Sequence, residues 1–114
     1  MLLLNQKIIA GIGNIYSDEI LWHAGIRPTR KTDSLKKIEI KKLFSALKYV
    51  LRLAIRNEGT SMRDYRKPDG TKGGYYQIRK AYNRAGERCS RDGAIIRRIE
   101  IGGRSAYFCP RHQE

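Results

Sequence analysis

The stretch Leu3–Pro28, which reads LLNQKIIAGIGNIYSDEILWHAGIRP, decides the fold of the first half of the chain. Apolar residues recur at near-helical spacing on both sides of its centre. Between them, Gly11 and Gly13 permit a tight turn that residues with a Cβ would resist. The stretch therefore predicts a helix, a tight glycine turn and a second helix, with Asn14 as the N-cap of the second helix.

The turn predicted around Asn14 is suited to binding a phosphate. It presents backbone N–H groups and an amide side chain at the start of a helix, where anions are favoured. Asp18 and Glu19 follow in the first turns of the same helix. Their negative charge complements the helix dipole at that end, so this placement explains the pair without a catalytic role.

Size and charge limit the possible classes of protein. With 114 residues, the chain forms one domain or two very small modules with a modest core. Its formal net charge is +13: residues 1–59 carry eleven Lys or Arg against five Asp or Glu, and residues 60–114 thirteen against six. This favours nucleic acid as the partner, the alternative being a basic protein without a defined polyanion target. No run approaches the roughly 18 apolar residues of a membrane span, so we expect a soluble, intracellular protein without a membrane partner.

A long helix is predicted from a cap at Asp33 or Ser34 to about Asn57, closed by Gly59. We expect its apolar stripe to bury the two helices of the opening stretch. The stripe consists of Ile40, Leu43, Phe44, Leu47, Val50, Leu51, Ala54 and Ile55. Lysines and arginines occupy much of the remaining surface, where plain solvation and contact with nucleic acid are both open.

The segment 59–86 is predicted to be a long loop, because glycines and a proline punctuate it. Its tyrosines alternate with Lys and Arg, a mixture that suits contact with unpaired bases or, alternatively, covers the edge of the core. From Ala94 the pattern changes to strands, with isoleucines up to Ile101, a Gly102-Gly103 turn, and a second strand over Ser105–Phe108. The chain is therefore predicted to be mainly α with a small β-hairpin.

Four possible metal ligands frame the hairpin in the pattern Cys-x2-Asp … Cys-x2-His: Cys89, Asp92, Cys109 and His112. Zinc ribbons and fingers place Cys or His at all four positions around a similar turn, and an Asp oxygen is a weaker zinc ligand. The pattern favours zinc, with Asp92 or a water as the fourth ligand. Three alternatives stay open: a Cys89–Cys109 disulfide, which an intracellular location disfavours, metal-free thiols of a lost site, or Asp92 as an ordinary turn residue.

These motifs resemble those of the bacterial formamidopyrimidine-DNA glycosylases along essentially the whole chain. The stretch Leu3–Pro28 is similar to the family's helix–two-turn–helix segment and is the most specific of the motifs. Residues 59–65, GTSMRDY, and the Asp-Gly-x-x-Gly of residues 69–73 resemble its damage-recognition loop and favour this branch over the related endonuclease VIII branch. Residues 82–89 and 104–109 resemble its C-terminal zinc finger.

The resemblance implies roles for particular residues. Asn14 and Arg104 would bind DNA phosphates, Lys7 would assist, and Tyr16 completes the predicted DNA-binding set. The loop Thr60–Tyr76 would fold over an everted oxidised purine. The two cysteines of the finger would bind zinc. The resemblance thus implies a helix–two-turn–helix bundle followed by a zinc-finger-like hairpin.

The chain also departs from the family pattern. Family fingers carry four cysteines, whereas Asp92 and His112 stand here at the second and fourth positions. His23 and Arg27 are exchanged relative to common members. Family members also have an N-terminal β-sandwich domain with a catalytic proline and an adjacent glutamate. This chain starts at Met1, where that domain would have ended, so we expect no DNA cleavage by this chain alone.

Three interpretations follow. In the first, the chain is the DNA-binding part of a base-excision-repair glycosylase for oxidised purines and needs a separate N-terminal catalytic domain. In the second it is a stand-alone DNA-binding module, and in the third a small RNA- or rRNA-binding protein. We expect damaged duplex DNA as the partner and a bacterial cytoplasmic, nucleoid-associated location. The expected units are a helical domain (1–59), a loop and linker (60–87) and a zinc-finger-like hairpin (88–114).

Overall fold

The computed structural model describes residues 14–57 and 74–114. Its elements, in chain order, are α2 (Asn14–Ala24), the 3₁₀ turn η1 (Thr32–Ser34), α3 (Lys37–Arg56), α4 (Gly74–Ile78), β1 (Arg97–Ile101) and β2 (Arg104–Phe108). The predicted class, mainly α with a small β-hairpin, is confirmed. The first predicted helix, the glycine turn and most of the predicted damage-recognition loop lie outside the described residues.

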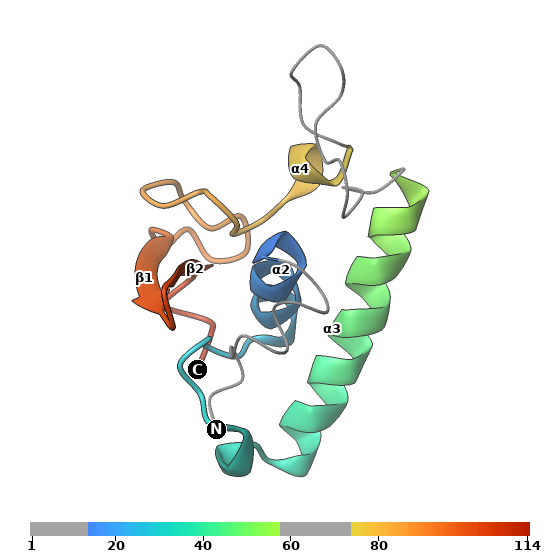
Figure 1. The fold of residues 1–114 in the computed structure, drawn as a ribbon, viewed down its shortest axis with the longest axis vertical. Helices are drawn as coiled ribbons and strands as arrows, with labels where there is room; N and C mark the ends of the chain where they lie inside the picture. Colours follow the sequence, from blue (N-terminus) through green and yellow to red (C-terminus); the bar gives the residue numbers. More distant parts are fainter. Residues whose placement is uncertain (1–13, 58–73) are drawn as a thin grey trace.

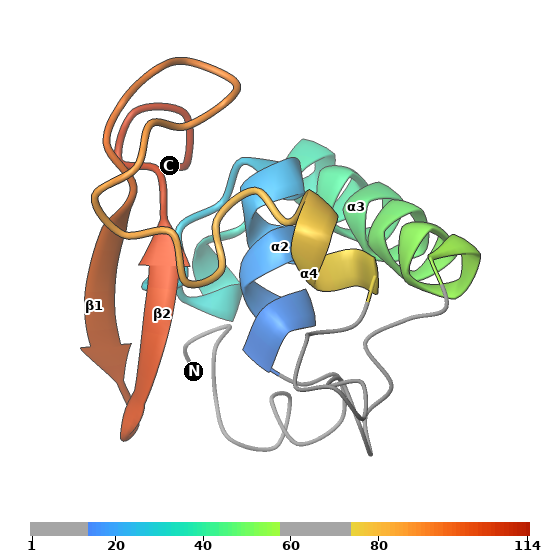
Figure 2. The ribbon, with the colours of Figure 1, turned by 90° about the horizontal axis from the view of Figure 1, so that it is seen from above.

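Helix α2 is the central element, with α3 on one side of it and the hairpin on the other (Figure 1, Figure 2). It is buried nearly all round, as a helix enclosed on two sides must be. One face contributes to the main core, which comprises Tyr16, Ile20, Leu21, Ala24, Ile26, Ala46, Val50, Ala54 and Ala106. Another face of α2 carries Trp22, which packs in a second cluster. We call this cluster the finger core, and its other members are Ala81, Cys89, Ile96 and Cys109.

The two acidic residues of α2 directly follow its first turn and are buried. No acidic residue lies in the first turn of the helix, and Glu19 is fully buried. Its carboxylate accepts hydrogen bonds from three successive backbone N–H groups, those of Lys80 (2.6 Å), Ala81 (2.7 Å) and Tyr82 (2.9 Å). Glu19 therefore fixes the segment that leads into the hairpin onto α2.

Helix α3 begins later than predicted. The predicted cap at Asp33 or Ser34 is wrong, because these residues form η1 and the N-cap is Lys36. The Glu39 side chain accepts a hydrogen bond from the backbone N–H of Lys36 (2.9 Å) and pairs with Arg30 (2.9 Å). A carboxylate at the third helical position thus supplies the start signal that sequence reasoning assigned to the preceding residues.

The apolar stripe predicted on α3 is only half buried. Val50 and Ala54 are buried in the main core, and Leu43 and Leu47 pack against it. The other four residues, which we call the exposed α3 stripe, are exposed to 39%, 59%, 40% and 81%: Ile40, Phe44, Leu51 and Ile55. The prediction of one fully buried stripe is therefore wrong for these four residues, because α3 contacts α2 through a narrower face than the apolar pattern covers.

The predicted hairpin is confirmed, with Arg97 opposite Phe108 and Ile101 opposite Arg104 in antiparallel register. The turn residues Gly102 and Gly103 both have positive φ, 57° and 85°, as a type I′ hairpin turn requires. β1 begins three residues later than predicted, because Ile95 forms only an isolated bridge with the segment before the hairpin.

The predicted loop 59–86 is also corrected, since α4 forms within it. Among the described residues, no helix is both long and apolar enough to cross a membrane.

Replacing Glu19 by Ala tests the hold of α2 on this segment. The change leaves three backbone N–H groups without their acceptor, and hydrogen bonds to charged groups contribute about 1.5–3 kcal/mol each. We expect the free energy of unfolding to fall by at least about 3 kcal/mol in urea titrations. The matched control is Glu87→Ala, which removes a half-exposed carboxylate paired with Arg84 at 2.9 Å and should cost less than about 1 kcal/mol. Equal losses in the two variants would contradict this role of Glu19.

Candidate metal centre and nucleic-acid interface

The four predicted metal ligands come together at the end of the hairpin that is remote from its turn. Cys89 and Asp92 lie before β1, and Cys109 and His112 lie after β2. One ligand atom from each residue lies within 4.8 Å of the others. The antiparallel pairing of the strands brings the two ligand pairs together, as the sequence spacing predicted.

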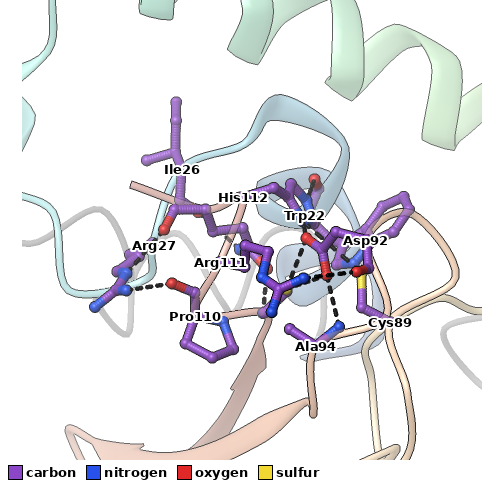
Figure 3. Close-up of polar contacts among 11 residues, drawn as sticks. Trp22, Ile26, Arg27, Cys89, Asp92, Ala94, Pro110, Arg111 and His112 are labelled. Atoms are coloured by element: carbon purple, nitrogen blue, oxygen red, sulfur yellow. Dashed lines mark hydrogen bonds and ion pairs between the residues drawn. The ribbon is translucent and has the colours of Figure 1, made fainter.

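Direct contacts link the four side chains (Figure 3). Oδ1 and Oδ2 of Asp92 lie 3.2 and 3.1 Å from Sγ of Cys109, and Oδ2 also lies 2.9 Å from Nδ1 of His112. Sγ of Cys89 lies 3.8 Å from the same nitrogen. Both cysteines are buried free thiols, so the disulfide alternative is not formed in this structure.

The orientation of His112 is fixed from outside the cluster. Its Nε2 lies 2.9 Å from the backbone oxygen of Trp22 on α2. Because a carbonyl only accepts, Nε2 is the donor in this contact, and Nδ1 faces Asp92 and Cys89. A hydrogen bond from the second ring nitrogen to a backbone carbonyl is the usual support of a histidine metal ligand.

The acid–base properties of the cluster suit a cation. Burial opposes ionisation of Asp92, but hydrogen bonds from the backbone N–H of Ala94, from Cys109 and from His112 hold the pKa of its carboxyl below the usual range. Burial raises the pKa of the Cys109 thiol, so a metal would have to displace its proton. Two sulfurs, one imidazole nitrogen and one carboxylate oxygen form a donor set that fits tetrahedral zinc.

The chain end is anchored to the connection after α2. Arg27 donates from Nη2 to the backbone oxygen of Pro110 (2.6 Å; Figure 3). It also donates from Nε to the backbone oxygen of Gln113 (2.8 Å), and its guanidinium lies over the ring of Phe108. The buried side chain of Gln113 donates to the backbone oxygen of Ile26 (2.9 Å). Arg27 therefore fixes the segment that carries Cys109 and His112.

His23, the other departure from the family pattern, has a packing role. Its ring contacts those of Trp22 and Tyr49 edge to face. Burial, together with the positive charges of Lys80 and Arg91, lowers the pKa of His23 to about 4. The imidazole is therefore neutral at pH 7 and fits the apolar surroundings without a counterion.

The structure describes some of the predicted DNA-binding residues in full and others only in part or not at all. Asn14 is the first residue of α2, whereas its side chain and the whole of Lys7 lie outside the described residues. Tyr16 packs in the main core with 8% of its surface exposed. A contact of these three residues with DNA stays a prediction.

Arg104 lies at the start of β2 and pairs with Asp18 of α2, with Nη2 and Oδ1 3.0 Å apart. No sequence pattern indicates this pair, because 86 positions separate the two residues. Burial raises the pKa of the Asp18 carboxyl to about 7, while the charge and hydrogen bond of Arg104 act in the opposite direction. Sequence reasoning thus missed the contact of Asp18 with the predicted phosphate-binding arginine.

Two family models match the chain. Residues 1–66 match the formamidopyrimidine-DNA glycosylase H2TH domain, and residues 86–111 match the zinc finger found in FPG and IleRS. The second match spans Cys89, Asp92 and Cys109 of the donor cluster.

Curated relatives show the same similarity. A formamidopyrimidine-DNA glycosylase of Desulfitobacterium hafniense is 48% identical over 108 residues, which is 95% of this chain and 40% of that protein. One of Carboxydothermus hydrogenoformans is 44% identical over 112 residues, 98% of this chain and 43% of that protein. The chain therefore spans about two fifths of the length of these relatives.

Solved structures resemble the fold. Lactococcus lactis Fpg in complex with DNA containing an abasic site has a TM-score of 0.80 and 36% identity, covering 90% of this chain and 37% of that one. MutM in complex with DNA containing carbocyclic 8-oxo-G has a TM-score of 0.77 and 37% identity, covering 90% and 36%.

Metal analysis tests the donor cluster. Protein purified without added zinc should contain close to one equivalent by elemental analysis, because two buried thiols and an oriented imidazole supply strong ligands. Asp92→Cys should bind zinc more tightly and Asp92→Asn more weakly, since a thiolate is the better zinc ligand. Asp33→Asn, an exposed acid away from the cluster, should change nothing. Less than about a tenth of an equivalent, unchanged after zinc is added back, would contradict a zinc site.

Proposed function

Because the chain belongs to the formamidopyrimidine-DNA glycosylase family, we propose that it is the DNA-binding C-terminal part of a base-excision-repair glycosylase acting on oxidised purines. Its partner is then duplex DNA, in particular damaged duplex at the bacterial nucleoid. Excision of the base belongs, in this proposal, to residues beyond the matched two fifths of the relatives. The DNA complexes of similar proteins support the proposal.

One observation carries the proposal: the Asp18–Arg104 pair lies next to the first turn of α2. Asn14 and Asp18 are four positions apart on this helix and so share one face. Arg104, held by Asp18 at 3.0 Å, therefore lies close to the end of α2 where backbone N–H groups favour an anion. The helical and finger parts thus offer cationic and N–H donors to the same DNA backbone.

The metal has a structural role in this proposal. Zn²⁺ bound by Cys89, Asp92, Cys109 and His112 would fix the base of the hairpin that carries Arg104. The chain then divides, as the sequence suggested, into a helical domain (1–59), a loop and linker (60–87) and a zinc-finger-like hairpin (88–114). Lys7 and Tyr16 are proposed as further contributors to the DNA surface, the latter through its hydroxyl.

The exposed α3 stripe supports a protein partner besides DNA. Exposed apolar side chains gathered along one helix face often mark an interaction site. A second copy of this chain is a poor occupant, because α3 carries six Lys or Arg against one Glu and two such faces would repel. We propose that the stripe binds the part of a family glycosylase that lies outside the matched region, either as a neighbouring domain or as a separate chain.

A mixing experiment tests this contact. The part of the Desulfitobacterium hafniense relative outside the matched region should bind the 114-residue chain, and the double variant Phe44→Ser/Ile55→Ser should weaken that binding at least about 10-fold in calorimetry. The variant should fold with nearly unchanged stability, since both side chains are exposed. Lys48→Ser, on the same helix, is the matched control. Equal binding by the parent and the double variant would show that the stripe is not the contact, and no binding by the parent would favour a stand-alone module.

A salt titration tests DNA binding. Fluorescence anisotropy with a labelled duplex should give a dissociation constant on the order of 10⁻⁴–10⁻⁶ M near physiological salt, because phosphate contacts dominate non-specific binding. The logarithm of the affinity should fall linearly with the logarithm of the salt concentration. Each phosphate contact removed should lower the slope by about 0.9. A flat plot would contradict the electrostatic account.

Variants in the same titration locate the contact. Asn14→Ala and Arg104→Ala should each weaken binding by the equivalent of about 1–2 kcal/mol, the range for hydrogen bonds to charged groups. The double variant Lys36→Ala/Lys37→Ala removes two positive charges at the start of α3, more than either variant above, and serves as the control. If the Lys36→Ala/Lys37→Ala variant loses more DNA affinity than Asn14→Ala and Arg104→Ala, the DNA-binding face lies on α3.

A further inference from the structure

The guanidinium of Arg104 is held rigidly before any ligand binds. Its Nη2 donates to Oδ1 of Asp18 (3.0 Å), and its Nε donates to the backbone oxygen of Ser105 (2.8 Å). The Asp18 side chain is fully buried and that of Arg104 is 10% exposed. An arginine side chain normally samples many rotamers, and two fixed donors remove most of that freedom.

The third nitrogen of the same guanidinium, Nη1, has no hydrogen-bond partner among the described residues. This donor is buried, and Oδ2 of Asp18 is a buried acceptor in the same condition. Buried polar atoms are nearly always paired, so an unpaired cationic N–H is a candidate contact for an anionic ligand. The guanidinium presents donors in a fixed plane that matches the oxygens of a phosphate.

We propose that Asp18 is a positioning residue that holds the Arg104 guanidinium in the orientation in which it binds a DNA phosphate. This inference rests on the DNA-binding function proposed above. Asp18 makes no contact with DNA in this proposal and acts only through Arg104. It also joins α2 to β2, so that the arginine moves with the helix start that offers the other phosphate contact.

The opposite effect is physically possible and makes the proposal testable. An ionised carboxylate beside an arginine neutralises part of its charge, which weakens attraction to a phosphate. If this effect were the larger one, removing the charge of Asp18 would strengthen DNA binding. Positioning predicts that the same change weakens it. The sign of the effect therefore separates a positioning acid from a competing acid.

The proposal also predicts a pH dependence. Burial raises the pKa of Asp18 to about 7, and the groups that face this carboxyl are Arg104 and the backbone of Tyr107 on β2, and Glu19 on its own helix. Protonation below pH 7 weakens the hold on Arg104. The Arg104-dependent part of the DNA affinity should therefore grow between pH 6 and pH 8.

The experiment measures duplex binding by fluorescence anisotropy for four proteins: the parent, Asp18→Asn, Arg104→Ala and the double variant. Asp18→Asn keeps the shape of the side chain and removes its charge. We expect it to weaken binding about 5-fold in the parent and to have no effect in the Arg104→Ala background, because it acts through that residue. The matched control is Glu100→Gln, which neutralises the exposed partner of Arg98 on the same hairpin and should change binding less than about 2-fold.

The outcomes are distinct. Unchanged or tighter binding by Asp18→Asn, with Arg104→Ala weakened, would overturn the positioning role and leave the DNA-binding function intact. A parent without salt-dependent binding would instead overturn the function. If Asp18→Asn does not fold, the positioning role is tested by the pH dependence instead. The DNA affinity of the parent is divided by that of Arg104→Ala, at pH 6 and at pH 8. A ratio that rises with pH supports the proposal, and a constant or falling ratio contradicts it.

Discussion

Two adjacent carboxylates on one buried helix connect the two halves of this molecule. Asp18 reaches the first residue of β2, and Glu19 binds three backbone N–H groups of the segment that leads into the hairpin. Burying a charge costs several kcal/mol unless partners compensate for the loss of water, on the order given by desolvation of single ions. Each acid has such partners only when the finger is docked on α2. The geometry of the candidate DNA surface depends on this docking.

The two acids differ in how well their partners satisfy them. Glu19 accepts hydrogen bonds from three N–H donors. Asp18 has one charged partner and one oxygen without a hydrogen bond. We interpret Glu19 as a structural residue and Asp18 as part of the phosphate-binding surface. Buried polar atoms without a full set of hydrogen bonds are typical of functional sites.

Much of this arrangement could be predicted from local patterns. The Gly102-Gly103 turn with flanking isoleucines predicted the hairpin, and the spacing of Cys89 to His112 predicted the donor cluster, because both depend on residues close in sequence or paired across one turn. The long helix was predicted for the same reason. Its cap was not, since Glu39 acts from within the helix and Asp33 is the more conventional start signal.

The features that sequence could not reveal are those that require tertiary packing. Nothing in the pattern relates Asp18 to Arg104, and a helix-dipole role explained Asp18 and Glu19 well enough in isolation. The α3 pattern predicted an apolar stripe correctly but not how much of it α2 would cover, so Phe44 and Ile55 were expected in the core and are exposed. Apolar periodicity identifies a face and does not identify its partner.

The central claim is that the start of α2 and the first residue of β2 form one phosphate-binding surface. Nitrogen-detected NMR of the zinc-loaded protein, titrated with a short duplex, tests it most directly. The account predicts that the Asn14 backbone signal and the Arg104 Nε–H signal shift together, with the same midpoint in DNA concentration. Shifts confined to the lysines and arginines of α3, with Asn14 and Arg104 unchanged at saturation, would contradict it.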